Sequence, residues 1–189
     1  MKYVSLLFVV LINIQLTQLA CCQEVTELES FNKTNNHQVG VGFAVTSFSS
    51  NFAYYVTPHY AYRHGRHQIS FSPFYGRLDA VPEQQNVGVG FEYRIYPCKN
   101  LGKVRYYSPV SIHYTFEWFD SRRDHTLLYG LGAGSETDLG KKFGLSVDIR
   151  FALGQTIESN RNEPDNAVLG SDLGLKYYFL PTIRLSYNL

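Results

Sequence analysis

The chain has 189 residues, of which 15% are aromatic and 17% charged, and its formal net charge is +1. This length fits one domain, and a nearly neutral charge argues against a nucleic-acid-binding protein, which would show a basic stripe. After the N-terminal segment, no stretch reaches the about 20 apolar residues that a membrane helix needs. Insertion into a membrane as helices is therefore excluded, whereas insertion as a β-barrel remains open.

Residues 1–22 have the parts of a cleaved export signal: Lys2 at the positive start, an apolar core over 4–12 and the small-residue stop Ala20-Cys21-Cys22. The core, at about nine residues, is too short to cross a bilayer. Cleavage after Cys22 would leave Gln23 as the mature N-terminus. In the alternative, a lipoprotein signal, Cys21 or Cys22 would carry the acyl chain, and stable anchoring would then need more than one such chain.

Residues 23–37 are polar and show no clean period, so we expect an N-terminal tail on the periplasmic side. Cleavage at Cys22 leaves only Cys98 in the mature chain, which excludes an intrachain disulfide. No His or Cys lies at ligand spacing from Cys98, so we expect neither a metal nor a cofactor. The remaining 38–189 are predicted to form one β-barrel.

From Gln38 onward, large apolar residues alternate with small or polar ones, most strictly in 87–96, Val-Gly-Val-Gly-Phe-Glu-Tyr-Arg-Ile-Tyr. Successive side chains of a strand point to opposite faces. The pattern fills eight segments of about 10–12 residues, the length of a tilted membrane-spanning strand. Their apolar faces carry no charged residue, and a Lys or Arg there would cost about 2–4 kcal/mol at mid-bilayer. The pattern predicts an antiparallel transmembrane β-barrel, with the tyrosines and Trp118 as girdles at the membrane surfaces.

Turns and loops separate these segments. Arg63-His-Gly-Arg66 predicts a tight hairpin, and Pro58 and Pro73, which cannot donate to a ladder, predict bulges or unpaired positions. Connectors after the third, fifth and seventh segments are mostly longer than those after the second and sixth. Longer loops face outside in such barrels, so we expect the longest one, 155–166, to lie outside the cell.

The C-terminus continues the alternation to the last residue. The apolar residues Ile183, Leu185, Tyr187 and Leu189, with Tyr third from the end, resemble the signal by which outer-membrane proteins engage their insertion machinery; the usual terminal Phe is Leu189 here. The chain resembles the small outer-membrane barrels of the OmpA-like and OmpX-like family. The resemblance rests on this C-terminal segment and on two motifs, Gly-Phe-Glu-Tyr-Arg at 90–94 and Gly-Leu-Lys-Tyr-Tyr-Phe at 174–179. The resemblance implies a fold and a Gram-negative outer-membrane location, with outer-membrane lipid around it, more than an activity.

The number of strands is open at this point. Nine strand-like segments are present, yet a bacterial barrel with both termini in the periplasm needs an even number. We expect eight strands, with the last nine residues extending or replacing part of the eighth. The alternative is ten strands, the tenth coming from 24–36.

The polar faces carry charges of both signs. An eight-stranded barrel is just wide enough for side chains to fill it, so these charges are expected to pair and close the lumen rather than line a narrow pore. The predicted lumen network consists of Arg63, Glu92, Arg94, Glu117, Asp148, Arg150, Asp172 and Lys176.

One inward group could carry chemistry. Ser111, His113 and Thr115 share a face with Glu117, and an outer-membrane lipid A deacylase is a barrel hydrolase with His and Ser two apart. Here Thr follows His113 where Ser would stand. We therefore expect a structural or surface-interaction protein, its external loops meeting an unknown partner, with a lipid-acting barrel enzyme as the alternative. A lipocalin-like soluble barrel would need an apolar interior, opposite to the charges placed here.

Overall fold

The computed structural model describes residues 36–48, 51–78, 85–97, 104–119, 122–160 and 175–189. The predicted signal peptide, most of the predicted tail, Cys98 and Asp172 lie outside these ranges, as does the second half of the predicted external loop, 161–166. The first half, 155–160, is strand rather than loop. Eight strands make up the described chain: β1 (Asn36–Phe48), β2 (Asn51–His64), β3 (His67–Leu78), β4 (Gln85–Ile95), β5 (Val104–Phe119), β6 (Arg122–Asp138), β7 (Phe143–Asn160) and β8 (Leu175–Asn188).

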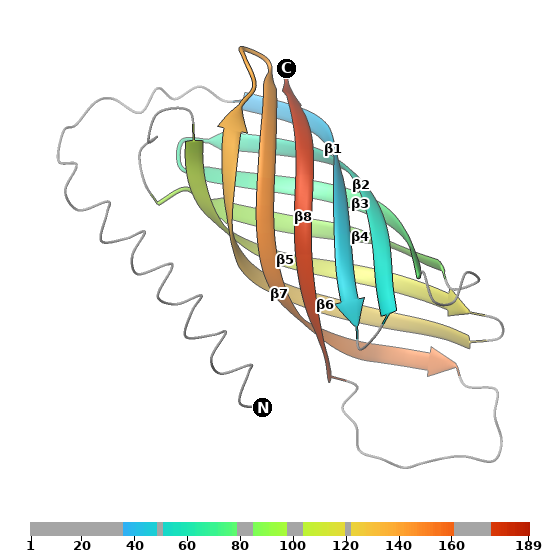
Figure 1. Cartoon of the computed structure of the whole chain (residues 1–189). Coiled ribbons are helices and arrows are strands. Elements are labelled where there is room, and N and C mark those ends of the chain that lie inside the picture. Colours follow the sequence, from blue (N-terminus) through green and yellow to red (C-terminus); the bar gives the residue numbers. More distant parts are fainter. Residues whose placement is uncertain (1–35, 49–50, 79–84, 98–103, 120–121, 161–174) are drawn as a thin grey trace.

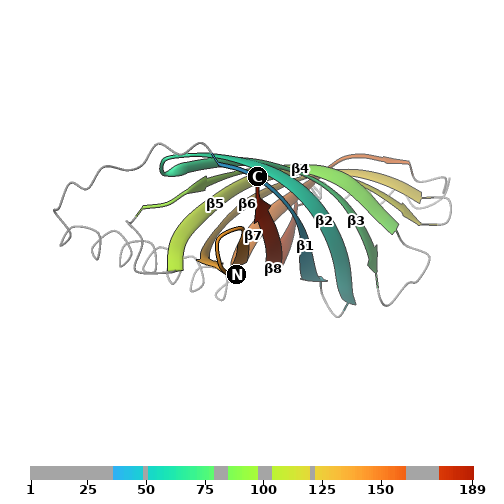
Figure 2. The same ribbon diagram turned by 90° about the horizontal axis from the view of Figure 1, so that it is seen from above.

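The eight strands form one closed antiparallel barrel. Each strand pairs with the next one along the chain, and β8 pairs with β1, which lies beside it in Figures 1 and 2. Closure gives every strand two partners, so the sheet has no free edge. The predicted eight-stranded barrel is confirmed. The ten-strand alternative is wrong, because β1 already occupies the edge of β8 that a further strand would need.

The two last strand-like segments of the sequence are one strand. β8 runs through Pro181, which stands opposite Ile149 of β7 and keeps the register from Leu175 to Tyr187 unbroken. On its other side, the β1–β8 ladder has a gap around Pro181. The proline therefore interrupts the pairing of β8 with β1, while the pairing of β8 with β7 continues through it.

Prolines elsewhere behave in the same way. The β2–β3 ladder has a gap at whose centre Pro58 faces Pro73, and the register is the same on both sides of it. Both residues remain in register with their other neighbours, Val41 and Val89. The predicted unpaired positions are thus confirmed, without a bulge between these two strands. Placing two residues that cannot donate opposite each other confines the loss to one site.

The faces of the sheet are inverted relative to a soluble domain. Along β3, Ile69 is 58% exposed while the next residue, Ser70, is 4% exposed, and the same alternation follows each strand. Buried positions hold charged side chains such as Glu92 and Arg150, and exposed positions hold Val, Ile, Leu, Phe and Tyr. Apolar side chains turned outward around a polar interior are the arrangement of a barrel surrounded by lipid.

Both ends of the barrel strands meet connectors. The start of β1 and the end of β8 lie at one end of the barrel, here called the terminal end. The β2–β3, β4–β5 and β6–β7 connectors lie at the same end, and the β6–β7 turn is near the C-terminus in Figure 1. Gly65 and Gly140 adopt positive φ in two of these turns (57° and 94°), as tight turns require. The opposite end, called the loop end, meets residues 49–50, 79–84, 120–121 and 161–174.

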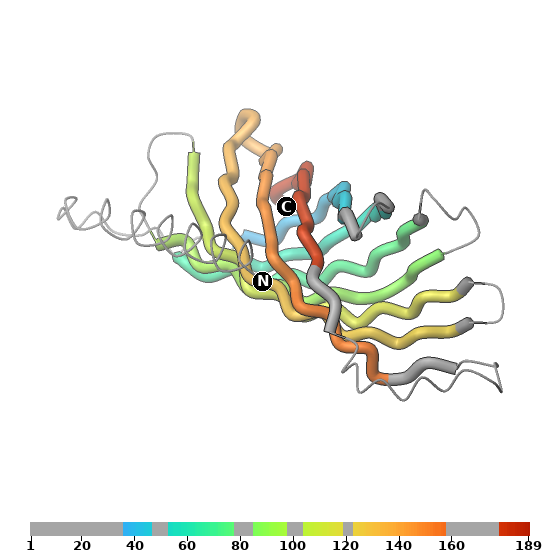
Figure 3. Tube along the Cα trace, turned by 60° about the horizontal axis from the view of Figure 1, so that its bottom comes forward, coloured from blue at the N-terminus to red at the C-terminus, as the bar shows by residue number. Residues whose placement is uncertain are grey.

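The expected difference in connector length has one exception. The connector after β5 covers only 120–121, because β6 begins at Arg122 and extends the β5–β6 ladder into the predicted loop. β5, β6 and β7 are accordingly the longest strands, at 16, 17 and 18 residues, and Figure 3 traces them side by side. Within the described ranges, the chain contains no helix with the length and apolar character to cross a membrane.

Candidate functional site in the barrel interior

A carboxylate on β4 gathers three guanidinium groups at the centre of the lumen. Glu92 accepts hydrogen bonds from Arg94 (Nε to Oε1, 2.5 Å), from Arg150 of β7 (Nη1 to Oε2, 2.7 Å) and from Arg184 of β8, whose Nη1 and Nη2 are 2.7 Å from Oε1 and Oε2. The bond with Arg184 is bidentate, a geometry that only a planar guanidinium offers. All four side chains are at most 6% exposed.

Asp148 of β7 is the second carboxylate of this layer. Its Oδ1 accepts from Arg150 Nε at 2.6 Å, and its Oδ2 accepts from the Tyr107 hydroxyl at 3.0 Å and lies 3.5 Å from Arg184 Nη1. Arg150 also donates to Thr182 Oγ1 at 3.1 Å. We call Glu92, Arg94, Asp148, Arg150 and Arg184 the ionic layer; it joins β4, β7 and β8 across the lumen.

A second cluster lies nearer the terminal end. Glu136 of β6 accepts from Arg105 Nη2 at 2.7 Å and from the Tyr96 hydroxyl at 2.6 Å, and Arg105 also donates to Asp138 at 2.6 Å. Arg63 stacks over the Tyr96 ring at 4.1 Å. Arg94 of the ionic layer stacks over the Tyr107 ring at 4.3 Å, and that ring packs against Tyr96 of this cluster at 5.5 Å. Polar contacts therefore continue along the lumen from its centre to the terminal end.

Inward glycines make room for the long side chains. A Cβ on Gly132 would come within 2.2 Å of the Ile149 carbonyl oxygen and 2.7 Å of Arg150 Cγ, and one on Gly42 would come within 2.8 Å of Arg184 Cγ. Each arginine thus lies across a glycine of the neighbouring strand. Without Cβ atoms at these positions, side chains from three strands can reach one carboxylate in a narrow interior.

Four of the eight predicted lumen residues meet in the ionic layer: Glu92, Arg94, Asp148 and Arg150. Arg63 belongs to the cluster near the terminal end. Glu117 lies toward the loop end, opposite Asp124 in the β5–β6 register. Asp172 and the side chain of Lys176 lie outside what the structure describes.

The lumen network predicted from the sequence does not contain Arg184. Thr182, Arg184 and Ser186 alternate with the apolar residues of the C-terminus, which places them inward as part of the eighth strand. Glu136, which the predicted network also lacks, is buried on the inward face of β6. The alternation along each strand puts both residues on the inward face, and this pattern is the sequence feature that could have identified them.

The candidate nucleophile group is not assembled. A Cβ on Gly130 of β6 would meet Ser111 Oγ at 2.5 Å, whereas a Cβ on Gly90 of β4 would meet His113 Nδ1 at 2.5 Å. The two side chains of β5 therefore lean toward opposite neighbouring strands. A nucleophile and its base need hydrogen-bond contact, and His113 Nε2 has no hydrogen-bond partner within the described chain.

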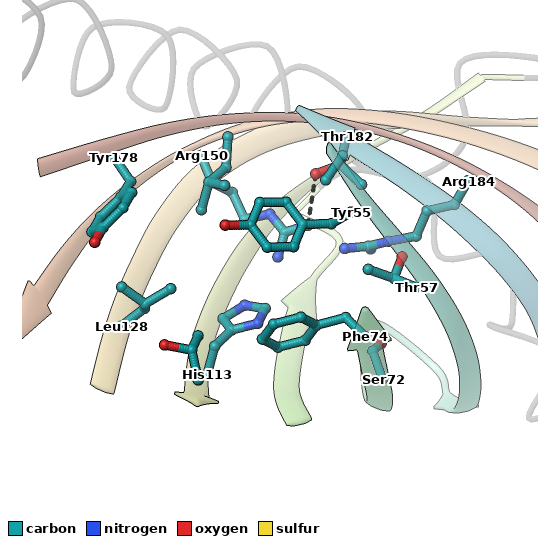
Figure 4. Close-up of a pocket in the computed structure, with 13 residues that line it drawn as sticks. Tyr55, Thr57, Ser72, Phe74, His113, Leu128, Arg150, Tyr178, Thr182 and Arg184 are labelled. Carbon is teal, nitrogen blue, oxygen red and sulfur yellow. Dashed lines mark hydrogen bonds between the residues drawn. The ribbon is translucent and has the colours of Figure 1, made fainter. Parts of the chain in front are cut away.

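A small cavity adjoins the ionic layer on the side of the loop end. Its volume is about 50 Å³, and Figure 4 shows it between Arg150 and Arg184 on one side and Phe74, Leu128 and Tyr178 on the others. Thr57 and His113 also line it. The cavity is the part of the described lumen where apolar walls and guanidinium groups face the same space.

The outer surface carries hydrogen-bonded aromatic pairs near both ends. Tyr60 and Tyr93 bond to Nδ1 of His37 and His67, each at 2.6 Å, and Tyr114 bonds to His125 in the same way. Aromatic rings with a polar tip suit the boundary between lipid and water. In the β6–β7 turn, the Lys142 amine donates to the Tyr187 hydroxyl at 2.9 Å, a bond that raises the pKa of Lys142.

Comparison with known proteins gives structural neighbours only: neither a family model nor a curated protein sequence matches the chain. The crystal structure of Neisserial surface protein A aligns over 82% of this chain and 96% of its own, with 12% identity and a TM-score of 0.51. The N-terminal β-barrel domain of Pseudomonas aeruginosa OprF (82% and 100% covered, 12% identity, TM-score 0.49) and a de novo designed transmembrane β-barrel (85% and 100%, 14%, 0.44) align less well. With its apolar exterior and polar interior, the chain has the fold of a small transmembrane β-barrel, as its sequence motifs predicted.

Proposed function

We propose that the chain is an integral protein of a Gram-negative outer membrane, with a structural or surface-interaction role and a lumen closed by its ionic layer. The observation that carries the membrane part is the inverted burial of the strands, with apolar side chains outside and charged ones inside. Such a surface is stable in lipid and prone to association in water. The predicted export signal supports delivery beyond the inner membrane.

Insertion is proposed to use the C-terminal strand. Ile183, Leu185 and Tyr187 lie on the outward side of β8, and the Leu189 amide donates to the His37 carbonyl oxygen at 2.9 Å, next to the seam where β8 meets β1. These apolar side chains point outward from the strand that closes the barrel, so the insertion machinery could bind them before the barrel closes. The insertion machinery of the outer membrane is the proposed partner.

Fractionation of cells that make the full-length chain tests this location. We expect the protein in the outer-membrane fraction, resistant to extraction with carbonate, and we expect an epitope inserted after Asn162 to be detected by antibody on intact cells. A soluble periplasmic protein would refute the membrane location. An epitope detected only after permeabilisation would reverse the orientation alone.

Closure of the lumen is proposed from charge pairing across it. The five side chains of the ionic layer bridge β4, β7 and β8 at hydrogen-bond distances, and the cluster near the terminal end adds Arg105 and Glu136 beneath them. In planar bilayers the purified barrel should show no steady conductance. A stable ohmic conductance in the wild-type protein would make a narrow pore the better description.

The alternative of a lipid hydrolase has less support. Ser111 and His113 lean apart, toward β6 and β4 respectively. Their outward neighbours, Ile112 and Tyr114, face the exterior. Release of fatty acid from outer-membrane lipids by the purified barrel, lost in the variant Ser111→Ala, would favour the enzyme.

A further inference from the structure

The ionic layer carries more positive than negative groups. Three guanidinium groups, of Arg94, Arg150 and Arg184, face the carboxylates of Glu92 and Asp148. With every member at most 6% exposed, the excess positive charge is held away from solvent. A buried charge without a counter-charge is unfavourable, so an anion beside this layer would be stabilising.

Three of the residues that line the cavity next to this layer each hold a buried hydrogen-bond donor without a partner among the described residues. Within the described chain, Arg184 Nε, Thr57 Oγ1 and His113 Nε2 are buried and make no hydrogen bond. Arg184 and Thr57 lie beside each other in Figure 4, both leaning over Gly42 from opposite sides. An N–H of arginine, a hydroxyl and a neutral histidine protonated on Nε2 can all donate, and a carboxylate accepts from several donors at once.

The remaining walls set the size and polarity of the occupant. Phe74, Leu128 and Tyr178 are apolar or aromatic, so a strongly hydrated ion such as sulfate would lose its water without replacement. An engineered cavity of about 150 Å³ takes one benzene molecule, so about 50 Å³ suits an ion of only a few heavy atoms. Glu117 and Asp124, further toward the loop end, also disfavour ions of high negative charge.

We propose that this cavity binds a small monocarboxylate of the size of acetate. The carboxylate oxygens accept from Arg184, Thr57 and His113, and the methyl group lies against Phe74 and Leu128. The inference adds a ligand to the proposed closed barrel. A barrel that conducts while binding acetate refutes closure alone, and an insulating barrel without acetate binding refutes the site alone.

Nuclear magnetic resonance of the full barrel, refolded in detergent micelles and labelled with ¹⁵N, tests the site directly. Sodium acetate should shift the Arg184 Nε–Hε resonance saturably, with half-saturation at about 1–10 mM, the range that four heavy atoms can supply. Acetate labelled with ¹³C should show contacts from its methyl group to Phe74 and Leu128. Sodium chloride and sodium sulfate at the same ionic strength should leave the resonance nearly unchanged.

Two variants and one control make the outcome decisive. Ala44→Leu fills the cavity from β1 and should weaken acetate binding at least tenfold, while Thr57→Val removes one donor at nearly constant volume and should weaken it several-fold. Ala133→Leu, on the outward side of β6, should leave binding unchanged. If Ala44→Leu fails to fold, Thr57→Val decides. The proposal is overturned if labelled acetate at 100 mM shows no contacts to Phe74 or Leu128. It is also overturned if all three salts shift the Arg184 resonance equally.

Discussion

Replacing Glu92 by glutamine should be one of the most damaging single substitutions in the barrel. The change keeps the size of the side chain and removes the negative charge that Arg94, Arg150 and Arg184 share at 2.5–2.7 Å. After the substitution, three buried guanidinium groups face one carboxylate, Asp148. The glutamine amide can also accept only at its oxygen, and each Glu92 oxygen accepts two of the four arginine hydrogen bonds, so two of them are lost.

The size of the effect follows from burial. At an effective dielectric constant of about 20, each charge pair about 4 Å apart contributes about 4 kcal/mol of attraction. Much of this is offset by the cost of removing the charges from water, and breaking a buried pair by removing one partner costs about 3–5 kcal/mol. We therefore expect Glu92→Gln to lower the free energy of unfolding by about 3–5 kcal/mol.

Urea titration of the barrel folded in lipid vesicles, followed by its electrophoretic mobility and tryptophan fluorescence, measures this change. The matched control is Asp138→Asn, which also neutralises a carboxylate bonded to arginine, but one whose side chain is 41% exposed. Exposed pairs contribute at most about 1 kcal/mol, so the control should lose no more than that. A loss below about 1 kcal/mol for Glu92→Gln would refute the conclusion that the ionic layer stabilises the fold.

Three further pairs of variants test other parts of the structure by the same titration. Asp148→Asn should cost about 3–5 kcal/mol and Val147→Asn less, because only the first leaves buried arginines uncompensated; equal losses would contradict the ionic layer. Gly132→Ala should cost about 1–3 kcal/mol through its contact with β7, whereas Gly144→Ala, 3.7 Å from its nearest neighbour, should be nearly neutral. Val147→Arg should lower the free energy of unfolding by about 2–4 kcal/mol, and Leu139→Arg, in a turn, by under about 1 kcal/mol. The reverse order would contradict the conclusion that Val147 faces lipid and Leu139 does not.

The fold could be predicted from the sequence because a barrel strand repeats every two residues. Once one residue such as Phe91 is known to face outward, the face of every other residue in its strand follows. A shift of one residue would turn Glu92 and Arg94 toward lipid. The same constraint identified the apolar face of every strand. The unpaired positions at Pro58 and Pro73 could be predicted for a different reason, because proline has no amide hydrogen to donate.

The interior could be predicted only in part, because parity gives the face of a residue and not its height in the barrel. Glu92 and Glu117 share the inward face, yet only Glu92 meets the ionic layer; strand tilt and register decide this, and neither is encoded locally. Arg184 was missed for a related reason. The sequence leaves open whether the last nine residues extend or replace the end of the eighth strand, whereas pairing with β7 carries β8 through Pro181 and on to Arg184.

Folding of the chain from residue 23 to 189, without its predicted signal, into lipid vesicles tests the central claim most directly. Diluted from urea into vesicles, the protein should run on a gel faster without boiling than after boiling, and its described strands should resist protease. Closed barrels in lipid keep their compact shape in detergent until heated. A single boiled-like mobility in vesicles, together with a soluble and protease-sensitive chain, would contradict a lipid-embedded barrel.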